Sequence, residues 1–275
     1  MTITAADVNK LRGITGAGMM DCKKALTEAN GDFEAAIDIL RKKGQKVAAS
    51  RSDRDAAEGL VITKKTDDSK TAVLIVLNCE TDFVAKNADF DKFANTIADV
   101  AVANKPATVE ELKALNYPGT SLTIADKITE EIGKIGEKID LSKYAIANAE
   151  FVAVYNHPGN KLAAFVGFNK VADAEVGRDV AMQAAAMAPI ALDENSVPEE
   201  VKQREIEVGK EQAINEGKPA DMAEKIALGR LNKFYKESTL VNQEFIKDGK
   251  LTVAQYLKSV DKDLAAIAFE RHSLN

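Results

Sequence analysis

The sequence of 275 residues predicts an α+β protein with an internally duplicated core. Residues 59–104 follow the order strand, turn, strand, helix, and residues 150–190 repeat that order. The residues before the first copy are helical in pattern, and a charged helical segment interrupts the second copy. A repeated hairpin-plus-helix unit, flanked by helical segments, is typical of the α+β class.

Residues 1–44 are predicted to form a compact domain of three helices. Asp32 is a good N-cap for the third helix, and the apolar residues after it recur at i, i+3, i+4 and i+7, namely Phe33, Ala36, Ile37 and Leu40. We expect this helix to end at Gly44. Residues 45–58 are rich in charged and small residues, which predicts a linker with partial helical character.

The first copy is predicted to form a core N-subdomain, residues 59–147. Strands are expected at 59–65 and 71–79, followed by an exposed loop and a helix that begins near Asp89. Further along, residues 109–115 and 124–133 are helical in pattern, and residues 136–147 are extended.

The second copy is predicted to form a core C-subdomain, residues 148–192 and 237–275. Its expected elements are strands at 151–155 and 162–168, a helix at 176–187, and a short helix and a strand at 253–257 and 264–269. Residues 193–236 interrupt this subdomain with a highly charged helical pattern, a turn at residues 215–219 and a second helical pattern with an apolar stripe. They predict an inserted antiparallel helical hairpin, a coiled-coil-like candidate for homodimer formation.

Charge and apolar content exclude several function classes. Lysine and arginine number 37 against 43 aspartates and glutamates, a net charge of −6, and no basic run is interleaved with aromatic residues. Direct nucleic-acid binding is therefore disfavoured, because phosphates require a basic face. No apolar run approaches the ~18 residues of a membrane span, and the start resembles neither a signal nor a transit peptide. We expect a soluble, cytoplasmic protein with two reduced, buried thiols, Cys22 and Cys79.

Catalytic signatures are scarce. The glycines at 16–18 lack the third glycine of a dinucleotide-binding turn, and no Gly-Lys-Ser/Thr ending of a phosphate loop occurs. The two histidines, His157 and His272, have no nucleophile motif around them. Glu80 and Asp82 could pair at a metal, although carboxylates at a loop edge are usually solvated. The sequence therefore predicts no cofactor and no resident metal, and it gives no support for triad chemistry.

The loop after the second strand presents a large apolar side chain in polar surroundings. Phe83 lies in the sequence Thr81-Asp82-Phe83-Val84, between a buried strand and a helix, where a protein can present a wedge. The alternative is that Phe83 staples the first turn of the following helix. Elsewhere, one of Met19 and Met20 must point outward at a helix start, and an exposed methionine is an adaptable docking residue.

Three stretches carry a family resemblance: residues 15–26 (TGAGMMDCKKAL), 28–32 (EANGD) and 78–86 (NCETDFVAK). They closely resemble the two signatures of bacterial elongation factor Ts, and the resemblance extends in order from residue 1 to about residue 270. The first residues are also similar to a ubiquitin-associated-type three-helix fold. The resemblance implies a guanine nucleotide exchange factor for elongation factor Tu, which releases GDP so that GTP can bind.

The resemblance also implies roles for individual residues. Those that match the segment disturbing the partner's Mg²⁺ site are Thr81, Asp82, Phe83 and Val84, with Phe83 as the inserted side chain. Those that match partner-binding positions are Leu11, Met19 and Met20 in the amino-terminal domain and His157 in the core. Glu80 stands where some relatives carry glutamine. Some relatives have a carboxy-terminal helical module after the last core strand, and contacts through it are expected to be missing here.

Two other function classes compete with nucleotide exchange. A binding adaptor would explain the amino-terminal helices but not the loop around Phe83. A carboxylate-dependent hydrolase built on Glu80 and Asp82 would need more acidic or histidine partners than the chain offers. Release of fluorescent GDP from elongation factor Tu distinguishes the three.

Overall fold

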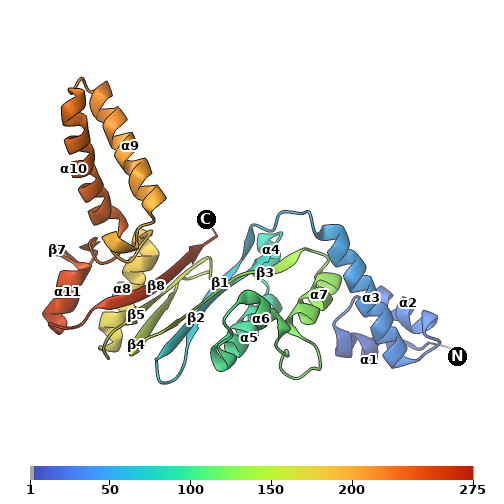
Figure 1. Ribbon diagram of the computed structural model, residues 1–275. Helices are drawn as coiled ribbons and strands as arrows, with labels where there is room; N and C mark the ends of the chain where they lie inside the picture. Colours follow the sequence, from blue (N-terminus) through green and yellow to red (C-terminus); the bar gives the residue numbers. More distant parts are fainter. Residues whose placement is uncertain (1–2, 275) are drawn as a thin grey trace.

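A computed structural model describes residues 3–274, apart from the side chains of residues 220 and 221. The chain is an α+β protein, as predicted. Figure 1 shows three parts along an elongated molecule: a helical module at one end, two sheets in the centre, and a helical hairpin projecting at the other end. None of the helices in residues 3–274 is long and apolar enough to cross a membrane.

The amino-terminal module consists of α1 (Ala5–Thr15), α2 (Met19–Glu28) and the first half of α3 (Phe33–Arg51). Thr4 and Asp7 form a capping box at the start of α1, and Asp32 accepts a hydrogen bond from the backbone N–H of Ala35 at the start of α3. The module closes over a small core of apolar side chains from all three helices: Val8, Leu11, Cys22, Ala25, Leu26 and Ala36.

The predicted end of the third helix at Gly44 is wrong, because α3 continues to Arg51. Its second half packs against α7 (Ile124–Ile135), and a glycine on each helix permits close approach. A Cβ atom at Gly133 would lie 2.6 Å from the Cα atom of Gly44. Residues 45–51 of the expected linker are therefore helical and in contact with the core, through Val47 and Ala48.

The first sheet has the order β1 (Glu58–Lys65), β2 (Thr71–Cys79), β3 (Ile139–Asn148), all antiparallel. Strand β2 is buried along its whole length. Because successive side chains point to opposite faces, Val73, Ile75 and Leu77 pack toward the helices, whereas Leu74 and Val76 face the second sheet. The covering helices are α5 (Ala88–Asn104), α6 (Val109–Ala114) and α7.

The second sheet has the same strand order, a hairpin followed by a strand that pairs with its second member. It consists of β4 (Phe151–Asn156), β5 (Leu162–Phe168) and β8 (Ala266–Ser273), covered by α8 (Ala174–Met187). Phe165 faces the first sheet, and Phe168 faces α8. A small hairpin of β6 (Glu244–Phe245) and β7 (Asp248–Thr252) precedes α11 (Val253–Val260) and was not predicted.

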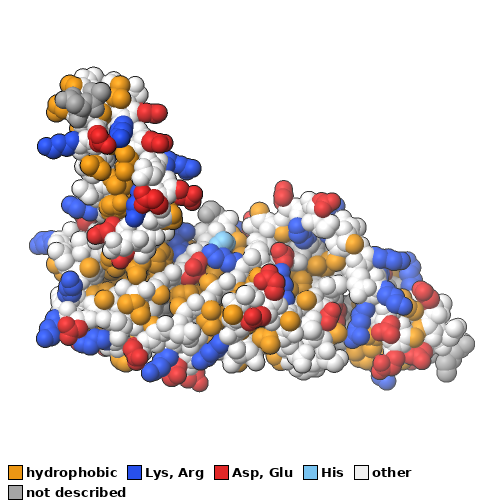
Figure 2. Space-filling model, viewed as in Figure 1, with side chains coloured by type: hydrophobic (Ala, Val, Ile, Leu, Met, Phe, Trp, Pro, Cys, Tyr) orange, Lys and Arg blue, Asp and Glu red, His pale blue; other side chains and the backbone are white. Residues whose placement is uncertain are grey.

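The projecting hairpin consists of α9 (Glu199–Asn215) and α10 (Ala220–Ser238), reached through the short helix η1 (Glu194–Ser196). Small residues line the contact between the two helices, and a Cβ atom at Gly209 would lie 3.1 Å from the Cα atom of Ala227. Figure 2 shows apolar side chains along this hairpin. Its exposed apolar side chains in the described part are Val208, Ile214, Met222 and Leu228.

Candidate functional site

The segment of residues 81–84 lies on a one-turn helix rather than in an irregular loop. Helix α4 (Asp82–Ala85) connects the end of β2 to the start of α5, and Thr81 is its N-cap. The Thr81 side chain accepts a hydrogen bond from the backbone N–H of Val84 at 3.4 Å. Asn87 then caps α5, which begins at Ala88, close to the predicted start. Both ends of this connection are thus fixed by capping side chains.

Phe83 points away from the protein. Its side chain is 84% exposed, whereas the next two residues, Val84 and Ala85, pack against the core of the first sheet. Successive residues of a helix differ by about 100° in direction, so one turn can anchor Val84 and still present Phe83. A ring that stapled the next helix would be packed against that helix. The exposure of Phe83 therefore excludes the staple interpretation in this conformation.

Glu137, on the chain just before β3, holds the N-cap residue. Its two carboxylate oxygens accept hydrogen bonds from the backbone N–H of Thr81 at 3.0 Å and from the Thr81 hydroxyl at 2.7 Å. The Cys79 thiol donates to the carbonyl oxygen of Thr81 at 3.2 Å. Burial, reinforced by the negative charges of Glu137 and Glu58, raises the pKa of the Cys79 thiol to about 12. Cys79 is therefore a neutral, structural thiol.

Glu80 joins the same region to the end of α3. Its carboxylate accepts hydrogen bonds from the backbone N–H of Lys138 at 2.7 Å, from Arg51 at 3.2 Å and from Arg54 at 3.1 Å. These contacts, the Lys138 N–H first, lower the pKa of the Glu80 carboxyl.

Asp82 lies on the outer side of α4 and pairs with Lys86 at 2.6 Å, which lowers the pKa of its carboxyl. Both carboxylates that were considered as metal ligands, Glu80 and Asp82, thus have cationic partners of their own. Within residues 3–274 no group of three or more His, Cys, Asp or Glu side chains could hold a metal ion.

His157 lies in the exposed turn between β4 and β5. The hydroxyl of Tyr155 lies 3.0 Å from its Nδ1 atom. Two neighbours tie this turn to the first sheet and its helix: Asn160 donates to Asp91 of α5 at 3.1 Å, and Lys161 pairs with Glu58 of β1 at 2.8 Å. Since Glu58 lies opposite Cys79 in the sheet, the turn is brought to the same end of the sheet as α4.

The amino-terminal module presents methionines at the start of α2. Met19 and Met20 are 52% and 62% exposed, and Ile14 at the end of α1 is also exposed. Ile14 was not among the predicted contact residues, because its place three residues after Leu11 puts both on one side of the helix and gives no sign that only one of them is buried. The Leu11 side chain, in contrast, is fully buried in the module's core, so a partner cannot touch it in this conformation.

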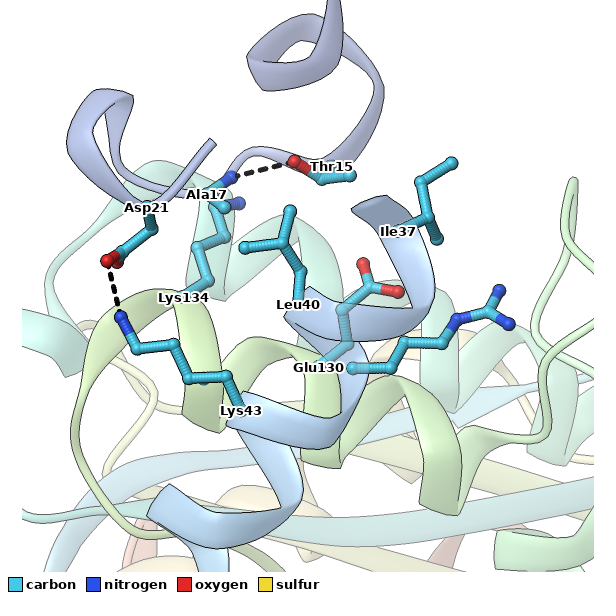
Figure 3. Close-up of a pocket in the computed structure, with 10 residues that line it drawn as sticks. Thr15, Ala17, Asp21, Ile37, Leu40, Lys43, Glu130 and Lys134 are labelled. Carbon is cyan, nitrogen blue, oxygen red and sulfur yellow. Dashed lines mark hydrogen bonds and ion pairs between the residues drawn. The ribbon is translucent and has the colours of Figure 1, made fainter. Parts of the chain in front are cut away.

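The module is seated firmly on α7. Figure 3 shows side chains from α3, α7 and the start of α2 converging around a small cavity. Its volume is about 30 Å³. Leu40 lies among these side chains, and Lys43 of α3 forms an ion pair with Asp21 of α2. The side chain of Lys134 covers Gly16, whose φ of 68° favours glycine. The orientation of the exposed methionines relative to the first sheet is therefore set by packing.

Comparisons with known proteins agree with the sequence signatures. The model of the family described as Elongation factor TS matches residues 80–275. A protein of Cytophaga hutchinsonii named elongation factor Ts is 53% identical over 277 residues, covering 100% of this chain and 99% of the relative. Proteins of the same name from Christiangramia forsetii and Porphyromonas gingivalis are 53% and 48% identical, and each alignment covers at least 98% of both chains. The chain belongs to the elongation factor Ts family.

Proposed function

We propose that this protein is a guanine nucleotide exchange factor for elongation factor Tu. It binds the GDP-bound GTPase, accelerates release of GDP so that GTP can bind, and performs no covalent chemistry. Family membership supports the identity of the partner. The observation that carries the mechanism is the 84% exposure of Phe83 on a helix whose neighbouring residues are anchored in the core.

In this proposal the segment 81–84 enters the partner near its Mg²⁺ site. Mg²⁺ requires near-ideal geometry of its oxygen ligands. A ring that displaces the groups supporting those ligands therefore weakens the binding of both Mg²⁺ and GDP to the partner. Thr81 orients the segment, Asp82 and Phe83 face the partner, and Val84 anchors α4 to the core.

Phe83 cannot supply all of the free energy required. A GTPase that holds GDP at nanomolar affinity is stabilised by about 12 kcal/mol, whereas burial of one Phe contributes ~1.5–3 kcal/mol. Additional contacts must favour the nucleotide-free conformation of the partner. We assign them to Met19, Met20 and Ile14 on the module and to His157, in the turn at the same end of the sheet as α4.

Leu11 contributes to the module's contacts with the partner only indirectly. Its buried side chain packs in one core with Cys22 and Ala25 of α2, the helix that begins with the exposed methionines. We infer that the module is of the ubiquitin-associated type. The hairpin of α9 and α10 carries none of these side chains. We assign it to self-association, for which its exposed apolar side chains are suited.

The proposal is tested by mixing the protein with elongation factor Tu loaded with fluorescent GDP, in an excess of unlabelled nucleotide. Catalytic acceleration of GDP release, at substoichiometric amounts of this protein, is the expected result. Binding without acceleration would overturn the proposal in favour of an adaptor. Absence of both binding and acceleration would overturn it altogether.

A further inference from the structure

Two carboxylates form a reciprocal clamp at the base of α4. Glu137 accepts the backbone N–H and the hydroxyl of Thr81, and Glu80, the residue before Thr81, accepts the backbone N–H of Lys138. Each chain segment thus provides a carboxylate for a backbone N–H of the other. The two segments are 56 residues apart in the sequence and meet because β2 pairs with β3, with Cys79 opposite Ile139.

Helix α4 depends on such a clamp. It has four residues, far fewer than an isolated helix needs in water, so it must be held by its surroundings. Val84 and Ala85 anchor one side of it in the core. The other constraint is the N-cap Thr81, whose position is set by the two hydrogen bonds to Glu137. Hydrogen bonds to ionised acceptors are short and strong, so they restrict the cap more than neutral contacts would.

The clamp also reaches the amino-terminal module. Arg51, the last residue of α3, donates to both oxygens of Glu80, and the Lys138 side chain donates to the carbonyl oxygens of Ser52 and Arg54. Helix α3, which belongs in part to the module, is therefore hydrogen-bonded through Arg51 to Glu80, the residue before the N-cap of α4. Such a link fixes the distance between the docking methionines and Phe83.

We propose that Glu80 and Glu137 are positioning residues for Phe83, and that Arg51 connects their clamp to the amino-terminal module. This inference rests on the proposed exchange function. Neither glutamate touches the partner in it; both act by holding α4 in the orientation that presents Phe83. Preorganisation of this kind lowers the entropy cost of inserting the ring.

The test compares Glu137→Gln and Glu80→Gln with the matched control Glu110→Gln. Glu110 lies on the exposed face of α6, and its side chain makes no hydrogen bond or ion pair within residues 3–274. Glutamine keeps the size of glutamate but removes its charge. We expect each clamp variant to slow GDP release from elongation factor Tu about three- to tenfold, and Glu110→Gln to behave as wild type. Amide exchange at Val84 and Lys86 should accelerate in Glu137→Gln, Glu80→Gln and Arg51→Ala, while far-UV circular dichroism shows all three variants to be folded.

A double-mutant cycle separates positioning from general stability. In a Phe83→Ala background, Glu137→Gln should cause little additional slowing, because the side chain that it positions is absent. If Glu137→Gln slows GDP release as much in the Phe83→Ala background as in the wild type, the inference is overturned. It is also overturned if both clamp variants release GDP at the wild-type rate and show unchanged amide protection. If the wild-type protein itself fails to accelerate GDP release, the proposed function fails instead, and the amide-exchange result still reports on the clamp.

Discussion

At the scale of single residues, the ring of Phe83 contributes little to the stability of the isolated protein. It is 84% exposed, while Val84 and Ala85 beside it pack into the core of the first sheet. Full burial of a Phe side chain is worth ~1.5–3 kcal/mol, and here that free energy becomes available only when a partner covers the ring. The side chain is therefore suited to stabilising a complex rather than the chain itself.

Phe83→Ala is expected to slow GDP release about 10- to 100-fold at millimolar Mg²⁺, if the buried ring stabilises the release pathway by its full burial energy. The fold should remain intact, since an exposed side chain carries little core energy. With Mg²⁺ removed by a chelator, the ring has less left to displace, so the ratio of the wild-type GDP release rate to that of Phe83→Ala should fall. Stopped-flow release of labelled GDP measures this ratio with and without Mg²⁺.

Met20→Ala is the comparison for that experiment. This residue is exposed on the module, remote in sequence from α4, and its loss should weaken docking with or without Mg²⁺. If Phe83→Ala were equally defective in the two conditions, Phe83 would be an anchor only, and its role at the Mg²⁺ site would be wrong.

Glu80 gives the stability of the protein a predictable dependence on pH. The hydrogen bond from the Lys138 N–H, together with the nearby Arg54 and Arg51, lowers the pKa of the Glu80 carboxyl in the folded state. These contacts therefore stabilise the fold above the unfolded pKa of about 4.3, and their contribution is lost as the pH falls through the folded pKa. The difference in unfolding free energy between wild type and Glu80→Gln should therefore narrow below about pH 4. Urea unfolding at a series of pH values measures it. A difference independent of pH would contradict this account.

At the scale of elements, the crossing of α3 and α7 determines where the module sits. The two helices meet at Gly44 and Gly133, where a Cβ atom on Gly133 would lie 2.6 Å from backbone of the other helix. A residue larger than glycine at either position would force the two helices apart. The same contact carries Val47 and Ala48 onto the core, so the second half of α3 belongs to the packing of the first sheet.

Gly133→Ala is expected to destabilise the protein by about 1–3 kcal/mol, the usual effect of overpacking against backbone that cannot move freely. Gly229→Ala on exposed α10 is the matched control, because its added Cβ meets nothing within 4 Å. There alanine should stabilise the helix by ~0.5–1 kcal/mol. Chemical denaturation of both variants gives the comparison, and equal stabilities would show that the helices adjust without cost.

At the scale of the whole molecule, α2 with its exposed methionines, α4 and the helical hairpin lie on separate parts of an elongated chain (Figure 1). An exchange factor that holds its partner at several places can bind the nucleotide-free form tightly and still release it when nucleotide returns. This follows from linkage. If the exchange factor lowers the partner's affinity for nucleotide by some factor, then bound nucleotide lowers the partner's affinity for the exchange factor by the same factor.

Replacement of residues 199–232 by a short Gly-Ser linker is expected to change self-association while leaving GDP release unaffected. The hairpin projects away from both sheets and carries neither the methionines nor α4 (Figure 1). The last residues of α10 are retained, because the carbonyl oxygens of Glu237 and Ser238 accept hydrogen bonds from Gln243 and Ile190. Light scattering and GDP release are the measurements. Loss of exchange with an unchanged mass would show that the hairpin contacts the partner.

The sequence alone determined the features that depend on near neighbours. The apolar period from Phe33 to Leu40 predicted a helix, and apolar runs separated by turn residues predicted both hairpins. The turn at residues 215–219 predicted the inserted helical hairpin. The position of Phe83 in polar surroundings also identified it as a candidate contact. These signals are local, because capping, turn geometry and helical periodicity act over a few residues.

Only the tertiary structure decided the features that join distant segments. Gly44 could not be recognised as a crossing point rather than a helix stop until Gly133 was placed against it. The sequence could not separate the wedge from the staple interpretation of Phe83, assign Leu11 to the interior, or pair Thr81 with Glu137 across 56 residues. The physical reason is that burial and hydrogen-bond partners depend on which elements the topology brings together, and local propensity carries no information about that.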